Sequence, residues 1–284
     1  MFAEKIDTLV HGLLVSDAYC LGAHWVYDEK QLREAKINWD GLNAPLAIWH
    51  KGKVAGDFTH YGDQLLWFYQ FLKDKTSFDA DAYQDFWFEK MQHYTGYIDG
   101  ATRVSLENIK NAKNPSGASS TDLSITARIV PLLQVSNTPQ EFYENVYKFI
   151  RITHNSELAL ACGDFFAKLL VLVLEGNEIY ASIQKLLHVS SPEIQKMVQN
   201  GLESKEADTF ITIREFGPAC DIKEGLSGVI HLLCKYDNLQ TMLQENAKAG
   251  GDSSARGMNA TMIFLAKYSL DALPKKWQAL NAGI

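Results

Sequence analysis

The chain has 284 residues, of which 46% are hydrophobic and 21% are charged, as in an ordinary globular protein with a full core. The formal net charge of −7 and an isoelectric point near 5.6 argue against a polyanionic partner, so we expect no nucleic-acid binding. We also expect no membrane partner, because the longest apolar run, residues 169–174, is too short to cross a bilayer and the first residues are unlike a signal peptide.

The four cysteines are scattered and include no C-x-x-C pair: Cys20, Cys162, Cys220 and Cys234. This spacing predicts small buried hydrophobic side chains rather than a thiolate metal site. It is also typical of a reducing compartment, so we expect a cytoplasmic protein.

In chain order, residues 6–17 place apolar side chains at helical spacing and predict a first helix. A second is expected over residues 65–72, directly after Asp63, and an aromatic stripe from Tyr83 to Tyr94 predicts a third. At residues 138–141 a capping box with proline at the first helical position predicts a helix start.

Another helix is expected to open at Asn155 or Ser156 and to run to Glu175, ending at Gly176. Its middle, residues 165–174, is apolar on nearly every side, so we predict that it is the central helix of the core.

Helix-start signals recur at residues 191–193, and residues 238–248 predict a helix that ends before Gly250. Only residues 209–214 alternate like a strand, and residues 111–121 are typical of a surface loop. The sequence therefore predicts an all-α fold, with residues 1–284 forming a single compact multi-helix domain.

The most informative segment is the turn at residues 250–257, where two glycines precede Asp252, Ser253 and Ser254 at the start of an apolar helix. Carboxylate and hydroxyl oxygens beside free helix amides are suited to chemistry on phosphates or sugars. The alternative is that Asp252 only caps the helix.

Three other segments combine polar groups with a helix end. Residues 56–64 form a polar loop that leads into a helix near Asp63. The alternative is that this loop is only a capped turn, with Asp63 near the helix N-terminus. Residues 16–18 are followed by residues 22–28, which contain a His-Trp-x-Tyr cluster. This cluster could equally be a packed aromatic corner. Residues 153–156 precede the most hydrophobic helix, where a cap explains Asn155 and leaves His154 open.

The order and spacing of these segments resemble the ADP-ribosylglycohydrolase superfamily, and within it the crystallin J1-like branch, from the first helix to Lys267. The family motifs correspond here to residues 16–18, 59–64, 153–155 and 250–255. The resemblance to the crystallin branch is carried by residues 24–28, 61–64 and 216–220 and by Arg256.

The resemblance implies an all-α fold whose cleft holds two Mg²⁺ or Mn²⁺ ions and binds the ribose of ADP-ribose, while a carboxylate-held water attacks the anomeric carbon. It assigns Asp63 and Asp252 as catalytic residues, and Asp63, Asp252 and Ser254 as metal ligands. The substrate-binding candidates are Thr59, His60, His154, Asn155, Gly251, Ser253 and Arg256. The expected partner is a small-molecule or ADP-ribosylated substrate.

The sequence departs from the family pattern at the metal ligands. His60 and Tyr61 follow Thr59 where the family has two aspartates, and in the late turn Ser254 and Ala255 replace an aspartate and a threonine. Two carboxylates poorly compensate the repulsion between two dications, so we expect one Mg²⁺ or Mn²⁺ ion at most, or none.

Arg256 suggests that a guanidinium beside Asp252 takes the place of a lost ion; the alternative is an exposed arginine. The leading functional hypothesis is a hydrolase of ADP-ribosyl or related glycosidic bonds. The second is a non-catalytic, crystallin-like relative that binds a nucleotide-type ligand or acts as a scaffold, and a helical interaction module ranks last. The hydrolase requires Asp63 and Asp252 to face each other across one cleft.

Overall fold

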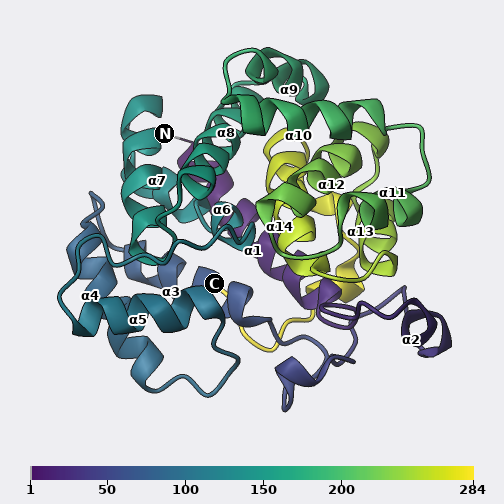
Figure 1. Ribbon diagram of the computed structural model, residues 1–284, viewed down its shortest axis with the longest axis horizontal. Coiled ribbons are helices and arrows are strands. Elements are labelled where there is room, and N and C mark those ends of the chain that lie inside the picture. The colour runs from purple at the N-terminus through teal and green to yellow at the C-terminus, as the bar shows by residue number, and fades with distance from the viewer. Residues whose placement is uncertain (1) are drawn as a thin grey trace.

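Two helices from opposite ends of the sequence form the centre of the molecule. In the computed structural model, which describes residues 2–284, α1 (Ala3–Cys20) packs along α14 (Ser253–Lys267) (Figure 1). Every residue from Ser253 to Ala266 is buried. The prediction that residues 165–174 supply the central helix is therefore wrong: in this part of α8 (Glu157–Leu174), which packs against α14, the side chain of Lys168 stays 37% exposed.

The other helices surround this pair in two groups. In Figure 1, α3 to α5 lie on one side of α1. On the other side α12 and α13 pack against α14, and α10 and α11 pack against α12. The remaining helices are α2 (Glu29–Glu34), α3 (His60–Leu72), α4 (Ala80–Gln92), α5 (Gly100–Lys110), α6 (Ser124–Ala127), α7 (Pro139–Thr153), α9 (Ile179–Leu187), α10 (Pro192–Glu203), α11 (Thr209–Phe216), α12 (Ile222–Lys235) and α13 (Leu239–Lys248), with short 3₁₀ turns at Ile48–His50, Val130–Val135, Leu270–Ala272 and Lys275–Gln278.

The predicted all-α fold is confirmed: from residue 2 to residue 284, β-pairing is limited to three isolated bridges. Residues 209–214 are not a strand but part of α11. The Asp208 side chain accepts a hydrogen bond from the Ile211 amide and caps this helix, which buries Thr209, Thr212 and Ile213 at a spacing of three and four residues.

Side-chain caps begin the helices at the predicted places. The hydroxyls of Thr138, Ser156 and Ser191 and the Asn238 side chain each accept a backbone amide hydrogen bond at the start of a helix. The second predicted helix, however, begins at His60, five residues before the expected start. Asp63 therefore lies within its first turn.

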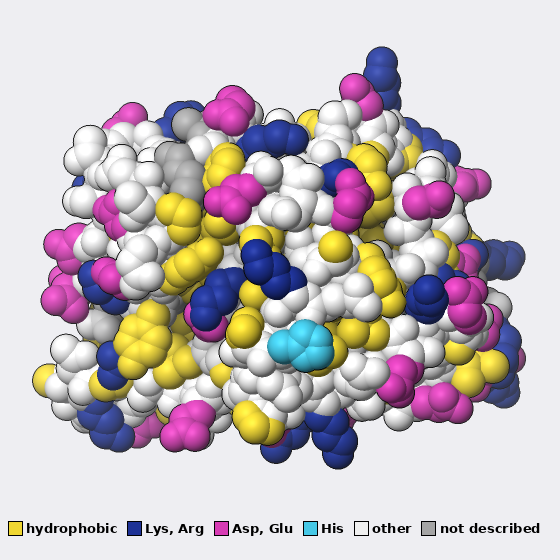
Figure 2. All heavy atoms as spheres, turned by 90° about the horizontal axis from the view of Figure 1, so that it is seen from above, with side chains coloured by type: hydrophobic (Ala, Val, Ile, Leu, Met, Phe, Trp, Pro, Cys, Tyr) yellow, Lys and Arg dark blue, Asp and Glu magenta, His cyan; other side chains and the backbone are white. Residues whose placement is uncertain are grey.

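The surface matches the acidic, mixed composition. On the face shown in Figure 2, acidic and basic side chains are interspersed and hydrophobic ones lie singly or in small groups. Among the described residues, none of the helices is long and apolar enough to serve as a membrane span.

Candidate functional site

The late turn is joined to the segment that follows α1. Gly250 and Gly251 have φ values of 69° and 59°. Gly251 pairs with Val26 in an antiparallel bridge, where the Gly251 amide donates to the Val26 carbonyl at 2.9 Å and the Trp25 amide donates to the Gly251 carbonyl at 2.6 Å. A Cβ atom on Gly251 would lie 2.1 Å from the Pro218 carbonyl oxygen, so only glycine fits.

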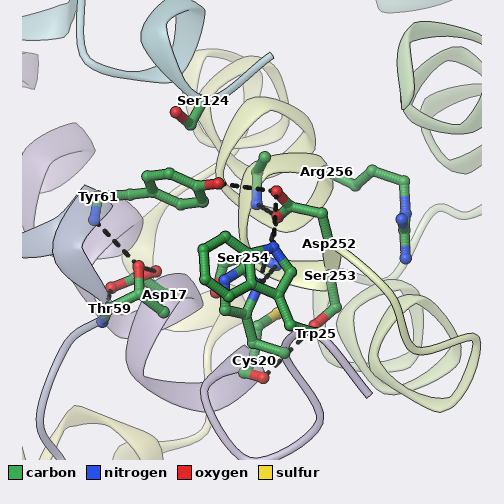
Figure 3. A network of polar contacts seen from close by, with 12 residues as sticks. Asp17, Cys20, Trp25, Thr59, Tyr61, Ser124, Asp252, Ser253, Ser254 and Arg256 are labelled. Carbon is green, nitrogen blue, oxygen red and sulfur yellow. Dashed lines mark hydrogen bonds and ion pairs between the residues drawn. The ribbon is translucent and has the colours of Figure 1, made fainter. Parts of the chain in front are cut away.

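Asp252 caps α14 and is surrounded by donors. Its Oδ1 accepts from the Ala255 amide at 2.9 Å and lies 3.4 Å from His24 Nδ1. Its Oδ2 accepts from the Tyr61 hydroxyl at 2.8 Å and from the Trp25 indole at 3.4 Å (Figure 3). The cap interpretation and the site interpretation of Asp252 thus describe the same carboxylate, which is fully buried.

Tyr61 reaches Asp252 because α3 begins close to α1. The Thr59 side chain caps α3, and its amide and hydroxyl donate to the buried Asp17 carboxylate at 2.7 and 2.8 Å. A Cβ atom on Gly62 would lie 2.3 Å from Asp17 Oδ2, so the helix start packs directly against this carboxylate. Asp17 therefore fixes the position of the α3 start and of Tyr61.

Beside this network lies a pocket of about 270 Å³ with acidic lining. The rings of Trp25 and Tyr97, whose centroids are 4.9 Å apart, form one wall. Asp99, Asp122 and Asp221 line it as well, together with Ser120, Thr121 and Cys220. Ten residues line this pocket and none of them is basic.

Asp122 links the pocket to Asp252. One oxygen of each carboxylate and the Cys220 sulfur lie within 4.8 Å of one another. Burial, and then the charge of Asp122, raise the pKa of Asp252 to about 6. Burial and the same two carboxylates also raise the pKa of the Cys220 thiol, so this thiol stays protonated at neutral pH.

This donor set does not fit the magnesium or manganese ions that the resemblance implies. A carboxylate offers about four lone-pair sites, and Asp252 accepts hydrogen bonds from Tyr61, Trp25 and the Ala255 amide. His60 and Tyr61 stand where the family has aspartates, and a protonated thiol is a poor ligand for a hard ion. Binding an ion at Asp252 would require Tyr61 and Trp25 to move away.

Asp63 does not join Asp252. Its Oδ2 lies 2.7 Å from Lys53 Nζ and accepts from the Tyr94 hydroxyl at 2.6 Å. The carboxylate that approaches Asp252 is Asp122. The expectation that Asp63 and Asp252 share one cleft is therefore corrected: Asp63 has a cation and a phenol as partners, which satisfy it locally.

Arg256 is neither beside Asp252 nor exposed. Its side chain is buried and points away from the carboxylate (Figure 3). Its guanidinium donates to Asn246 Oδ1 at 3.1 Å, to the Pro218 carbonyl at 3.1 Å and to the Gly250 carbonyl at 2.6 Å. The expected pairing with Asp252 and the alternative of an exposed arginine are therefore both wrong. The guanidinium instead holds the late turn in place through these three hydrogen bonds.

The other candidates lie around the same region with different partners. His60 Nε2 lies 3.1 Å from Asp99 Oδ2, and the Ser254 amide approaches His24. Ser253 is buried against the Cys20 carbonyl. His154 is buried with Nδ1 beside Thr153, while Asn155 accepts a bond from Arg151. The lining of the acidic pocket includes Asp99, the neighbour of His60, but none of these candidates.

Several pocket residues were not selected from the sequence. Asp122 directly follows the segment taken for a plain surface loop, and Ser120 and Thr121 of that run line the pocket. The Ser-Ser-Thr-Asp order before a buried helical turn is the signal that marks them. Asp99 is the side-chain cap of α5, whereas Tyr97 carries no recognisable signal.

Known proteins resemble this chain in sequence and in fold. A sequence model described as ADP-ribosylglycohydrolase matches residues 2–282. The chain belongs to the ADP-ribosylglycohydrolase family. Crystallin J1A from Tripedalia cystophora is 22% identical over 297 residues, covering 96% of this chain and 91% of the crystallin, and crystallin J1B is 22% identical over 293 residues, with the same coverage. A solved "ADP-ribosylglycohydrolase-related protein complex" has a TM-score of 0.74 at 17% identity, covering 99% of this chain and 94% of that one.

Proposed function

We propose that this member of the ADP-ribosylglycohydrolase family binds a ribosylated small molecule in the acidic pocket without a divalent ion. The observation that carries this proposal is the contrast between two carboxylates. Asp252 is enclosed by donors from its own chain, whereas Asp122 lines the pocket. On this proposal the pocket binds the type of ligand that the family binds, while the turn that would hold an ion is occupied by hydrogen-bond donors of the chain itself.

The lining suits a ribosyl group. Sugar hydroxyls donate hydrogen bonds, and Asp99, Asp122 and Asp221 supply acceptor oxygens. The Trp25 and Tyr97 rings supply apolar surface for the faces of the sugar. Asp122 Oδ1 accepts from the Ser124 amide at 2.8 Å, and its Oδ2 lies 3.4 Å from the Tyr61 hydroxyl, so acceptor positions remain for a ligand.

Calorimetric titration of ADP-ribose tests the proposal. We expect binding that is the same in EDTA and in millimolar Mg²⁺ or Mn²⁺, and about tenfold weaker binding in Asp122→Asn, because an amide replaces an acceptor with a donor. Asp164→Asn, an exposed carboxylate on α8, is the matched control and should leave the affinity unchanged. Binding only in the presence of metal, or unchanged binding in Asp122→Asn, contradicts the proposal.

Hydrolysis of an ADP-ribosyl bond is the second candidate, and the Asp122–Asp252 pair favours it. Glycosidases use two neighbouring carboxyl groups, one of them with a raised pKa, and Asp252 has such a pKa. Incubation with ADP-ribosyl-arginine and ADP-ribosyl-serine in EDTA checks this candidate. Turnover that disappears in Asp122→Asn would establish metal-independent hydrolysis, and no turnover would leave a binding protein.

A further inference from the structure

The connection between α2 and α3 is long and, apart from one 3₁₀ turn, has no regular structure. It covers residues 35–59, and the turn Ile48–His50 lies near its middle. Its tip, residues 48–54, exposes apolar side chains: Ile48 is 79% exposed, Trp49 52% and Val54 54%. Long connections of this kind are uncommon in compact domains, and many of them border binding sites. Such a connection keeps its position only through contacts with its surroundings.

The C-terminal segment, yellow in Figure 1, holds this connection at two places. Trp277 is fully buried and stacks on Tyr19 of α1 with ring centroids 3.8 Å apart. Its indole N–H donates to the Asp40 carbonyl at 2.9 Å, near the first end of the connection. Further along the segment, the Asn281 amide donates to the Gly56 carbonyl at 3.0 Å, near the second end.

Asn281 makes two more hydrogen bonds at this second end. Its Nδ2 donates to the Ala55 carbonyl at 3.0 Å and to Asp57 Oδ1 at 2.9 Å. The backbones also pack closely, since a Cβ atom on Gly56 would lie 2.9 Å from the Ala279 carbonyl oxygen. Asn281 is exposed, so water can replace its hydrogen bonds at small cost. This contact can therefore open without unfolding the core, and we call it the latch.

Asp57 connects the latch to the tip. Its Oδ2 accepts from the Val54 amide at 2.8 Å, and its own amide donates to the Val54 carbonyl at 3.1 Å. The Lys53 amide in turn donates to the His50 carbonyl at 3.1 Å. Lys53 Nζ also pairs with Asp63 of α3, and this ion pair does not involve the latch. Opening of the latch should therefore loosen the tip rather than detach it.

The tip packs behind the aromatic wall of the acidic pocket, which the Trp25 and Tyr97 rings form. The centroid of the His50 ring lies 5.3 Å from that of Trp25 and 6.1 Å from that of Tyr97. The Trp49 ring contacts the same two rings, at 6.5 and 5.8 Å. His50 is 3% exposed, and within residues 2–284 its ring nitrogens have no hydrogen-bond partner. Its ring is therefore held by packing.

We propose that Asn281 is a positioning residue of the acidic pocket, which acts by keeping the tip packed behind Trp25 and Tyr97. When its hydrogen bonds to residues 55–57 break, the tip loosens, His50 becomes accessible and the wall loses its support. A change at the exposed C-terminal segment is thereby transmitted to the pocket. The latch does not depend on what the pocket binds, whereas its effect on ligand affinity rests on the proposed function.

Asn281→Ala tests the latch through a measurement that needs no ligand. Diethyl pyrocarbonate modifies neutral imidazole rings that it can reach, and burial lowers the pKa of His50 to about 3, which keeps this ring neutral. We expect His50 to be modified about tenfold faster in the variant, as measured by peptide mass spectrometry. His231, a buried histidine on α12, is the internal reference and should react at the same rate in both proteins.

Hydrogen exchange shows where the chain loosens. The amides of Lys53, Val54 and Asp57 are each hydrogen-bonded within the connection. They should exchange about tenfold faster in Asn281→Ala, while the amides of α14 keep their rate. Unchanged labelling of His50, or exchange that accelerates equally throughout the chain, would overturn the latch.

Asn177→Ala is the matched control. It removes another exposed asparagine whose Nδ2 donates to a backbone carbonyl, that of Leu172 at 2.7 Å, and it should change neither His50 labelling nor exchange in the tip. Equal acceleration of His50 labelling in this control would show that the effect is not specific to the latch and would also overturn the proposal.

Calorimetric titration of ADP-ribose tests the effect on the pocket. Asn281→Ala should bind about fivefold more weakly, because only part of its molecules have a supported wall at any time. Faster labelling of His50 at unchanged ADP-ribose affinity would contradict the positioning role. If the unmodified protein does not bind ADP-ribose, the proposed function fails, while labelling and exchange still decide whether the latch exists.

Discussion

At the scale of single residues, Arg256 shows how a charged side chain can serve the fold at the edge of a site. It ties together three segments through Asn246, Pro218 and Gly250, and it packs so closely on α12 that a Cβ atom on Gly228 would lie 3.0 Å from its Cδ. A buried arginine that donates to two backbone carbonyls fixes the chain path rather than a ligand.

Arg256→Met should therefore lower the free energy of unfolding by about 3 kcal/mol or more, because three buried acceptors lose their donor. Urea unfolding measures this loss. Arg33→Met, which removes an arginine that is 68% exposed on α2, should change stability by less than about 1 kcal/mol. The ADP-ribose affinity of folded Arg256→Met should match that of the unmodified protein. A tenfold weaker affinity for ADP-ribose at unchanged stability would contradict this structural role and indicate that Arg256 contacts the ligand.

At the scale of elements, sequence periodicity predicts most helices of this protein, and capping residues predict where several of them begin. Thr138, Ser191 and Asn238 were recognisable because one side chain and its neighbouring amides decide a helix start. Sequence periodicity does not mark the central helix, because α14 is buried on all sides yet contains polar residues such as Arg256 and Asn259, which bond to Pro218 and Thr126 of distant segments.

The same reasoning explains how much of the site the sequence could give. The late turn was recognisable, because its glycines and cap are local features. The pairing of Asp252 with Asp122 and Tyr61 was not, because it depends on contacts across 130 and 191 positions of sequence, which no local pattern encodes. The position of Asp63 in the motif at residues 59–64 predicts a place beside Asp252, but this position carries no information on the side-chain partners of Asp63.

Gly251→Ala provides a test of the late turn as an element. A side chain there meets both a left-handed backbone and a contact of 2.1 Å with the Pro218 carbonyl oxygen, so we expect a loss of more than about 2 kcal/mol in urea unfolding. Gly176→Ala is the matched control. Gly176 also has positive φ, 96°, but a Cβ atom on it meets nothing within 4 Å, and about 1 kcal/mol is expected. Equal losses in the two variants would show that the contact is relieved by movement of the turn.

At the scale of the whole molecule, buried ionisable groups shape the dependence of stability on pH. Burial raises the pKa of Asp17 to about 6 from an ordinary 3.8, so the folded state binds more protons than the unfolded state between these values. Its contribution to stability is present below pH 4 and is lost as the pH rises through 6. His154 and His231, whose pKa values burial lowers to about 4, act in the opposite direction over the same range.

Asp17→Asn removes this carboxylate and with it the contribution of Asp17 to the pH dependence of stability. Relative to the unmodified protein, this variant should gain stability on going from pH 4 to pH 7, by about 2 kcal/mol, because the difference between the folded and unfolded pKa values of Asp17 is removed. Urea unfolding at half-unit steps of pH measures the difference. A difference that does not vary with pH would mean that Asp17 titrates in the folded protein as it does in the unfolded chain.

Trp25 adopts a left-handed backbone conformation, with a φ of 59°, which few residues with a side chain tolerate. Its indole lines the acidic pocket, contacts the rings of Trp49, His50 and Tyr97, and donates to the buried Asp252 carboxylate. The wall of the pocket and the cap of α14 thus depend on the same backbone conformation, so a change of backbone at position 25 would be transmitted to both.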